Sequence, residues 1–366
     1  MKPKKILIIG PMPGPTTGVS LANKVLVEGL RNQGSYQIKV VNTSFDQFKE
    51  NLGKFSFSKF FFYLKQNLHV FKVFGVDMVY ITPGQTFFGL LKYMLFIVTS
   101  KILSKELIIH IHGNYVGSEY NFLKGIKKKL FKWLLSQTSK GIVLSESLSG
   151  NMSPFVHKSK VFVLYNFVQD FLFSDKKIID NKLIQTAPKI IFLSNLMEEK
   201  GIFNLLEALR ILEETGVEYE AKIAGNLDNT HENKLLTYIN TLKNTKYVGV
   251  VSGKNKKDLL LWSNIFILPT FYKMEGQPIS ILEAMATKNV IVTTDHAGIS
   301  DIFKDTINGF FVEKNNVDSI YNILSYIGLN RIEIEKIGMY NQKYFLNNFT
   351  LNNFKINLLE IFNVDK

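Results

Sequence analysis

The sequence predicts an α/β protein with two doubly wound domains, and three observations lead to this fold class. The chain has 366 residues, which is more than a single compact core usually contains. Short runs rich in Ile, Val and Leu alternate with segments of helical spacing, as in the βαβ units of a parallel sheet. This alternation stops in a polar stretch at residues 174–188 and then begins again.

The first half of the chain supplies the strands of the first predicted sheet. Their near-continuous apolar character is typical of parallel strands that are buried on both faces. The expected strands are residues 5–9, 37–41, 78–81, 107–111, 141–144 and 161–164. Helical spacing occurs between them, for example at residues 19–31 and 124–136.

The second half repeats this organisation and ends in helices over residues 317–364. Its expected strands are residues 189–193, 219–224, 265–268 and 290–293. Its expected helices are residues 201–214, 231–243, 256–263 and 278–287. Ligands of such folds bind beyond the carboxyl ends of the strands, so we expect the site in the cleft between the two halves.

The composition restricts the partners and the location of the protein. The formal net charge is +13, which favours an anionic partner such as nucleic acid, a membrane surface or a phosphorylated small molecule. The absence of cysteine excludes disulfides and thiolate metal sites and fits a cytoplasmic protein. The first apolar run is followed at once by Gly10 and Pro11, so it reads as a strand and not as a secretory signal.

Two kinds of segment bear on membrane contact. The longest apolar stretch, residues 86–103, is interrupted by Lys92, which favours a buried or interfacial helix over a membrane span. Residues 55–74 and 123–135 combine lysines with Phe and Trp, as suits an anionic membrane interface. The alternative is a solvated helix face with apolar contacts beneath. We expect no nucleic-acid partner, because no recognisable nucleic-acid-binding motif occurs.

The strongest motif is PTFYKMEGQPISILEAMA, where an expected strand leads through a loop into a helix. Pro278 suits the first helical position, and the free backbone N–H groups beside Gly276 and Gln277 then form a phosphate site. Glu275 precedes this helix, and Glu283 lies within it on an otherwise apolar face. If Glu283 is buried it needs a partner, and vicinal ribose hydroxyls are suitable donors. The alternative is a solvent-facing residue.

Lys200 and a glycine-rich loop are weaker candidates for phosphate contacts. Lys200 lies at a strand-to-helix junction, where a phosphate can bind, although many loop lysines are only surface residues. Gly10, Gly14 and Gly18 follow the first strand with a spacing that matches neither the dinucleotide fingerprint nor a P-loop. These glycines still let the backbone approach a ligand.

His110 and His112 close an expected strand and lie on one face of it. No third ligand lies nearby in the sequence, and no Asp-x-Asp pair is present, so we expect no metal site. For His110 a structural role is the preferred interpretation.

These motifs together resemble glycosyltransferase family 4, whose members have the GT-B fold. The segment EGQPISILEAMA, preceded by IFILPT and followed by NVIVTTDHAGISDIF, carries the resemblance most specifically. LSNLMEEKG, VLYNF, HIHGN and the glycine loop fit the same family in the same order. The resemblance covers essentially the whole chain. It implies two Rossmann-like domains facing each other across a cleft, with the acceptor bound by residues 1–172 and the donor by residues 173–366. The last helix is expected to pack back on the N-terminal domain.

The resemblance also implies roles for the residues of the main motif. Glu283 matches the glutamate that holds the ribose hydroxyls of the nucleotide, and Glu275 matches the one near the donor sugar and its phosphate. Gly276, Gln277 and Pro278 lie where the backbone meets the diphosphate.

Four further residues take roles from the resemblance. Lys200 matches the lysine that neutralises the leaving diphosphate, so a metal ion is not expected. His112 matches the histidine at the donor sugar, and Gly18 matches the loop glycine near the diphosphate. Asn195 departs from the family, which often has an arginine there, and supplies a hydrogen-bond donor without charge.

Two more departures follow the main motif. The frequent double glycine is Ala297 and Gly298 here, and the common proline is Ser300. They concern the details of diphosphate binding and leave the family resemblance as it stands.

The activity implied is transfer of a sugar, with retention, from a nucleotide-diphosphate sugar to a saccharide or lipid-linked saccharide in cell-surface polysaccharide biosynthesis. No cofactor is expected, and the protein is expected in the cytoplasm, with peripheral binding at the inner face of the membrane. Two alternatives stay open. One is another GT-B activity, such as a sugar-nucleotide epimerase or a phosphorylase. The other is a sugar-nucleotide-binding protein without turnover.

Overall fold

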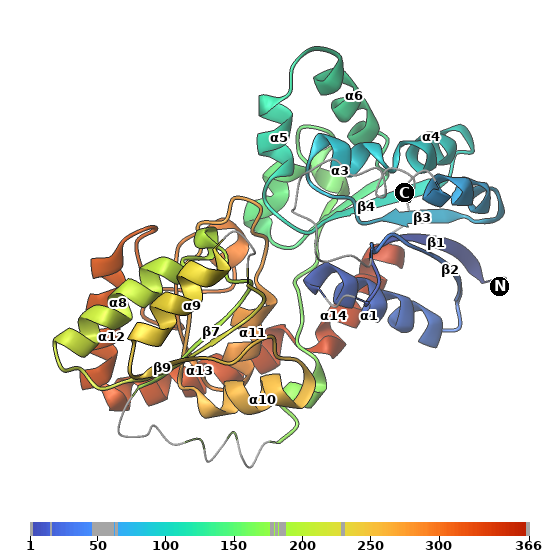
Figure 1. The fold of residues 1–366 in the computed structure, drawn as a ribbon. Coiled ribbons are helices and arrows are strands. Elements are labelled where there is room, and N and C mark those ends of the chain that lie inside the picture. The colour runs from blue at the N-terminus through green and yellow to red at the C-terminus, as the bar shows by residue number, and fades with distance from the viewer. Residues whose placement is uncertain are drawn as a thin grey trace. The chain divides into compact units, whose positions relative to one another are not determined.

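The computed structural model of the chain describes residues 3–14, 17–45, 62, 65–175, 179, 182, 188–227 and 231–363. The chain forms two compact units (Figure 1). Unit 1 comprises Met1–Asn166 and Phe354–Lys366, and unit 2 comprises Phe167–Asn353. Most of the predicted interruption at residues 174–188, and residues 55–61 of the first basic aromatic segment, lie outside the described residues.

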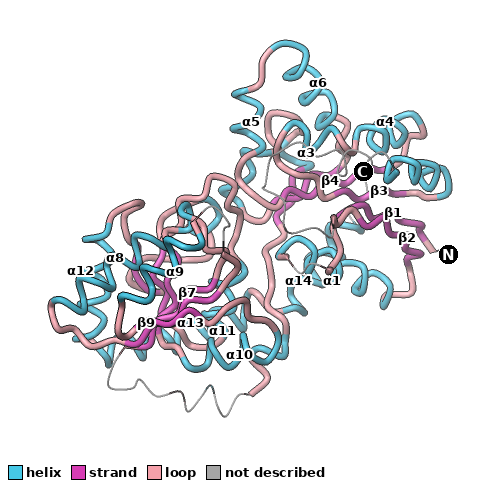
Figure 2. The backbone as a smooth tube through the Cα atoms, in the orientation of Figure 1, coloured by secondary structure: helices cyan, strands magenta, loops and turns pink. Residues whose placement is uncertain are grey.

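Unit 1 contains a six-stranded parallel sheet in the order β2-β1-β3-β4-β5-β6 (Figure 2). The central strands are apolar and buried on both faces, which is why they read as continuous hydrophobic runs. All the strands expected in the first half are present. Their bounds are β1 (Lys4–Gly10), β2 (Tyr36–Asn42), β3 (Met78–Ile81), β4 (Glu106–Ile111), β5 (Lys140–Val143) and β6 (Val161–Val163).

Helices cover both faces of this sheet (Figure 1). One face carries α1 (Gly18–Asn32) and α14 (Leu351–Asn363). The other carries η1 (Leu68–Gly75), α3 (Phe87–Leu91), α4 (Met94–Ile102), α5 (Val116–Phe122) and α6 (Gly125–Ser136). The short helices η2 (Glu146–Asn151) and η3 (Lys158–Lys160) precede β6. Helix α1 begins with a capping box, in which Thr17 and Ser20 each bond the backbone N–H of the other.

The C-terminal helix α14 is bound to unit 1 by polar contacts. Lys140, buried at the start of β5, donates to the carbonyl of Ile361 at 2.9 Å. The same ammonium group lies 2.9 Å from the carboxylate of Glu106. The hydroxyl of Tyr36 donates to Asn363 at 2.8 Å. The end of the chain therefore completes the unit in which the chain begins.

Unit 2 contains a second six-stranded parallel sheet, in the order β12-β11-β10-β7-β8-β9. Its strands are β7 (Lys189–Leu193), β8 (Glu220–Ala224), β9 (Thr245–Tyr247), β10 (Ile265–Leu268), β11 (Val290–Thr293) and β12 (Gly309–Phe311). The edge strands β9 and β12 were not expected, because three residues carry no readable pattern. Gly309 is required in β12, since a Cβ atom there would lie 1.8 Å from the carbonyl oxygen of Ile291.

The helices of unit 2 also lie on both faces of the sheet (Figure 1). They are α8 (Ile202–Glu214), α9 (Glu232–Thr241), α10 (Gly253–Trp262), α11 (Ile279–Ala286), α12 (Val317–Leu329) and α13 (Arg331–Asn348). The short helices η4 (Asp170–Leu172), η5 (Glu198–Lys200) and η6 (Ala297–Ile299) lie in connections. Two parallel sheets with helices on both faces confirm the predicted α/β fold with two Rossmann-like domains.

Each sheet has one point where the strand order reverses. In unit 1 the chain leaves β1 for β2 on one side and later adds β3 on the other side. In unit 2 the same reversal occurs between β7 and β10. Loops that follow the two strands at such a switch point run in opposite directions and leave a crevice at their carboxyl ends. The candidate sites are therefore sought at these two positions.

Candidate functional site

The switch point of unit 2 brings together Lys200 and Glu275. Lys200 ends η5 in the loop after β7, and Glu275 lies in the loop after β10. The ammonium nitrogen of Lys200 lies 2.5 Å from a carboxylate oxygen of Glu275, and the two side chains are only 11% and 9% exposed. The hydroxyl of Thr270 donates to the same oxygen at 3.1 Å. Two residues selected from separate motifs thus form one buried ion pair.

The backbone holds these two loops together. The amide of Phe271 donates to the carbonyl of Glu199 at 2.8 Å. Gly201 adopts a φ of +79°, and a Cβ atom there would lie 2.4 Å from the carbonyl oxygen of Pro269. Only glycine combines this left-handed conformation with such a close approach. The turn that carries Lys200 is therefore fixed against the loop that carries Glu275.

Helix α11 presents its N-terminus beside Glu275. Pro278 is the N-cap residue, so the helix begins at Ile279, one position after the predicted start. Among the described residues, no side chain caps this end, and backbone N–H groups at an uncapped helix start are a place where an anion can bind. Gly276 and Gln277 precede the cap and are buried, and the carbonyl of Gly276 accepts from the amide of Gly298 at 3.0 Å.

Glu283 is buried on α11 and has a partner that the sequence did not reveal. Its carboxylate lies 2.5 Å from the ammonium nitrogen of Lys256 on α10. Burial raises the pKa of Glu283, and Lys256 acts in the opposite direction. The solvent-facing interpretation of Glu283 is therefore wrong. Lys256 was missed because Lys254 and Lys257 on the same helix look equivalent in the sequence.

Asn195 lies exposed in the loop after β7, where its carbonyl accepts from the amide of Met197 at 2.9 Å. It belongs to the same loop as Lys200. The side chains of residues 194–196 carry no charge, and Lys200 is the basic residue of this loop.

His112 and Gly18 belong to unit 1. Gly18 is the first residue of α1, and His112 follows β4 directly. The imidazole rings of His110 and His112 have centroids 3.9 Å apart. His110 bonds the hydroxyl of Tyr80 at 2.6 Å through Nδ1, which supports its structural interpretation.

His112 has an unusual electrostatic environment. Desolvation lowers its pKa to about 3, so the ring is neutral at physiological pH. Its Nε2 atom is buried, and no described residue forms a hydrogen bond with it. A covered imidazole nitrogen without a partner is a group that a ligand hydroxyl can satisfy.

The described residues also show whether metal ligands gather in clusters and whether a helix could span a membrane. In the part of the chain that the structure describes, no three His, Cys, Asp or Glu side chains gather closely enough to hold a metal ion. The described helices also include none that combines the length and the apolar character needed to span a bilayer.

We predict that Lys256→Met makes stability depend more strongly on pH. In the folded protein the pKa of Glu283 lies above its ordinary value of 4.5. The free energy of unfolding therefore decreases as the pH rises from 4.5 to the pKa of the folded state. Removing Lys256 raises the folded pKa further, because burial is then unopposed. We expect the variant's free energy of unfolding to be lower than that of the unaltered protein by about 3 kcal/mol at about pH 8 and by clearly less at about pH 5.

Urea unfolding at both pH values measures this effect. Lys254→Met, an exposed lysine of the same helix, is the matched control and should change stability little at either pH. Equal losses at the two pH values for Lys256→Met would contradict the electrostatic role of the pair.

Comparisons with known proteins concern the family and the fold. The family model described as glycosyl transferases group 1 matches residues 174–344. The amylovoran biosynthesis glycosyltransferase AmsK of Erwinia amylovora is 29% identical over 141 residues, which are 37% of this chain and 35% of AmsK. A Campylobacter jejuni protein, N,N'-diacetylbacillosaminyl-diphospho-undecaprenol alpha-1,3-N-acetylgalactosaminyltransferase, is 23% identical over 82% of this chain and 78% of its own length.

The chain spans between a third and a half of the length of the first curated relatives that it matches. The crystal structure of HepE of Anabaena in complex with UDP and glucose is similar over 98% of this chain and 99% of that chain, with a TM-score of 0.73 and 15% identity. The chain has the GT-B fold, and residues 174–344, within its second unit, match the glycosyl transferases group 1 family.

Proposed function

We propose that the protein is a retaining glycosyltransferase that moves a sugar from a nucleotide-diphosphate sugar to a saccharide or lipid-linked saccharide. The observation that carries this proposal is the buried Lys200–Glu275 pair at the switch point of unit 2, beside the N-terminus of α11. The relatives support the substrate classes. HepE was crystallised with UDP and glucose, and AmsK is named for amylovoran biosynthesis. We therefore assign the protein to cell-surface polysaccharide biosynthesis.

The donor is held by unit 2 in this proposal. Glu283 accepts hydrogen bonds from the ribose hydroxyls, and Lys256 opposes the rise in the pKa of Glu283 that burial causes, which favours the ionised carboxylate. The N-terminal amides of α11, next to Gly276 and Gln277, face the diphosphate. Asn195 adds an uncharged donor from the opposite loop.

Lys200 stabilises the charge that develops on the leaving diphosphate. Without a ligand, Glu275 compensates the buried ammonium group, which would otherwise be costly to desolvate. When the diphosphate binds, Lys200 gains a second anionic partner. A positioned cation in a buried site lowers the barrier because it needs no reorganisation during the reaction. Catalysis is therefore proposed to proceed without a metal ion.

Retention follows if the leaving phosphate takes the proton from the acceptor hydroxyl on the same face of the sugar. No nucleophile of the protein is then required. His112 contributes a neutral imidazole to the donor sugar, and its buried Nε2 atom pairs with a sugar hydroxyl. The acceptor is proposed to bind unit 1.

Unit 1 is also proposed to contact the inner face of the membrane. Its helices η1, α3, α5 and α6 expose large apolar side chains, among them Phe71 (72%), Phe88 (69%), Phe122 (74%) and Ile126 (84%). Helix α6 and its N-cap carry five lysines and no acidic residue. Apolar side chains between lysines suit an anionic lipid interface. The Campylobacter jejuni relative is named for an undecaprenol-linked acceptor, which supports a substrate at a membrane.

The first test of the proposed function is a thermal-shift panel of UDP-, GDP-, ADP- and TDP-sugars. A ligand at 100 times its dissociation constant should stabilise the protein by about 2.7 kcal/mol. We expect a shift with one nucleotide class and its loss in Glu283→Ala. Lys254→Met serves as the control that keeps the shift. A shift that persists in Glu283→Ala would remove the ribose role from this residue.

The second test is the rate of sugar transfer in Lys200→Ala. We expect kcat to fall about a hundredfold and nucleotide affinity to fall much less, because most of the charge on which the lysine acts appears in the transition state. Lys243→Ala, an exposed lysine of unit 2, is the control. Nucleotide binding without any turnover in the unaltered protein would favour the non-catalytic alternative, and sugar-nucleotide isomerisation would favour the epimerase alternative.

The third test is sedimentation with vesicles of phosphatidylglycerol and phosphatidylcholine in equal amounts. We expect the double variant Phe88→Ser and Ile126→Ser to bind about tenfold more weakly, because two apolar side chains no longer enter the interface. Leu329→Ser in unit 2 is the matched control, since that side chain is 85% exposed. Equal losses in both variants, or no binding of the unaltered protein, would contradict the membrane contact.

A further inference from the structure

In unit 2, the loop after β11 is hydrogen-bonded to the loop after β10, which contains Glu275. The hydroxyl of Thr294, a fully buried residue, donates to the carbonyl of Thr270 at 2.5 Å. Further along the same two loops, the amide of Gly298 donates to the carbonyl of Gly276 at 3.0 Å. The loop after β10 is therefore held near both of its ends by the loop after β11.

A third contact, made by His296, lies between these two in the sequence. Its Nε2 atom is 2.8 Å from the carbonyl oxygen of Tyr272. A carbonyl oxygen can only accept, so this nitrogen carries the hydrogen and the imidazole donates. Both residues are half-buried. The bond therefore fixes the middle of the loop after β10.

The backbone of Tyr272 is also part of a hydrogen-bonded turn. Its amide donates to the hydroxyl oxygen of Thr270 at 3.2 Å, and its carbonyl accepts from the amide of Glu275 at 2.9 Å. The same hydroxyl of Thr270 donates to the carboxylate of Glu275 at 3.1 Å. Because these bonds connect the whole turn, a displacement of Tyr272 also affects Glu275.

The ring of Tyr272 contacts the lysine of the proposed donor site. The ammonium nitrogen of Lys200 lies 4.9 Å from the ring centroid, within the range in which an aromatic face attracts a cation. Burial raises the pKa of Tyr272, and the carboxylates of Glu275 and Glu199 raise it further, so the phenol stays protonated. Lys200 therefore contacts both a carboxylate and a neutral aromatic ring.

The second contact restricts the position of the ammonium group. A lysine side chain is flexible, and its ammonium group has no fixed direction for its hydrogen bonds, so one carboxylate partner leaves it free to pivot. The ring of Tyr272 limits this movement without occupying an N–H donor, because a cation–π contact needs only the charge. A charged group that is held in place stabilises a transition state better than one that must first be ordered.

We propose that His296 and Tyr272 are positioning residues for Lys200. The imidazole of His296 holds the backbone of Tyr272, and the ring of Tyr272 holds the ammonium group of Lys200 where the leaving diphosphate develops charge. The proposal rests on the proposed function, in which Lys200 stabilises that charge. It extends the site to the loop after β11, to which the proposed function assigns no residue.

The first test measures kcat and the affinity for the nucleotide sugar that the thermal-shift panel identifies. We expect Tyr272→Leu to lower kcat about tenfold and to weaken binding much less, because most of the charge that Lys200 meets appears in the transition state. Tyr272→Phe should retain the rate, since it keeps the ring. Tyr321→Leu, at a half-buried tyrosine of α12, is the matched control and should change neither quantity.

Two variants of His296 separate its hydrogen bond from its volume. A glutamine carboxamide supplies an N–H donor near the position of Nε2, whereas leucine supplies none. We expect His296→Leu to lower kcat about fivefold, as loss of one hydrogen bond would give, and His296→Gln to restore most of the rate. His157→Leu, at an exposed histidine, is the control. Equal losses in the Gln and Leu variants would contradict the hydrogen-bonding role.

A double-mutant cycle shows whether the two residues act through the lysine. In the Lys200→Ala background, Tyr272→Leu and His296→Leu should cause no further loss of kcat, because the group that they position is absent. Losses that multiply with the loss in Lys200→Ala would overturn the proposal, since the two residues would then act independently of the lysine.

A spectroscopic test requires neither turnover nor a ligand. In protein labelled with 13C at the Cε atoms of lysine, the ring current of Tyr272 should shift the Lys200 signal, which is assigned by its loss in Lys200→Arg. We expect Tyr272→Leu and His296→Leu to move this signal toward the position of an exposed lysine, and Tyr272→Phe and His296→Gln to keep it in place. A signal that is unchanged in Tyr272→Leu would contradict the contact.

The two readouts separate this proposal from the proposed function. A Lys200 signal that depends on Tyr272 and His296, in a protein without transfer activity, counts against the proposed function and supports the positioning of the lysine. Transfer that depends on Lys200 but not on Tyr272 or His296 counts against the positioning role alone.

Discussion

The proposed donor site depends on the parallel pairing of β7 with β10. Ile190 pairs with Ile265 and Ile191 with Phe266, so two strands far apart in the sequence end side by side. The chain leaves these strands in opposite directions because the strand order reverses between them. Lys200 and Glu275, 75 positions apart, are therefore able to meet as a buried pair. The apolar packing of the two strands thus determines where the Lys200–Glu275 pair lies.

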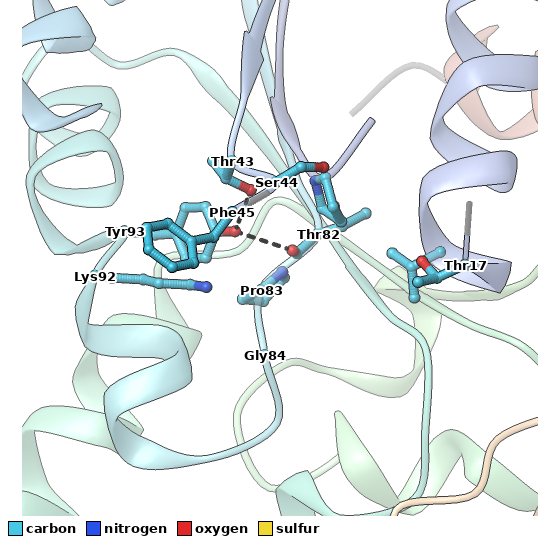
Figure 3. A pocket seen from close by; sticks show the side chains of 11 residues that line it. Thr17, Thr43, Ser44, Phe45, Thr82, Pro83, Gly84, Lys92 and Tyr93 are labelled. Carbon is cyan, nitrogen blue, oxygen red and sulfur yellow. Dashed lines mark hydrogen bonds between the residues drawn. The ribbon is translucent and has the colours of Figure 1, made fainter. Parts of the chain in front are cut away.

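The same constraint operates in unit 1. There the reversal lies between β1 and β3, and a pocket beside it is lined by Thr43, Thr82 and Lys92 (Figure 3). In unit 2 the lysine is already matched by Glu275. A buried cation that is paired with a carboxylate can remain in the protein without a ligand. Both units therefore place a lysine beside the point where the strand order reverses.

The sequence predicted the features that follow from local pattern. The buried strands were found because β1, β3 and β10 are apolar at their buried positions, and β4 is apolar at all of its buried positions except His110. The resemblance was recognised from the motif around Glu275 and Glu283. The edge strands β9 and β12 were missed because three residues show no period. Lys256 was missed because its partner lies 27 positions away on another helix. Lys92 was read only as an interruption of an apolar run, since the pocket that it lines is assembled from four separate connections.

The return of α14 to unit 1 has a topological consequence. Val168 and Thr350 form a β-bridge, and the amide of Val168 donates to the carbonyl of Phe349 at 3.2 Å. The first and last segments of unit 2 are therefore bonded neighbours, so this unit is an insertion within unit 1 and not a sequential partner of it. A truncation before Phe354 removes a helix from the half of the protein that is synthesised first. Unit 1 can be complete only after the whole of unit 2 has left the ribosome.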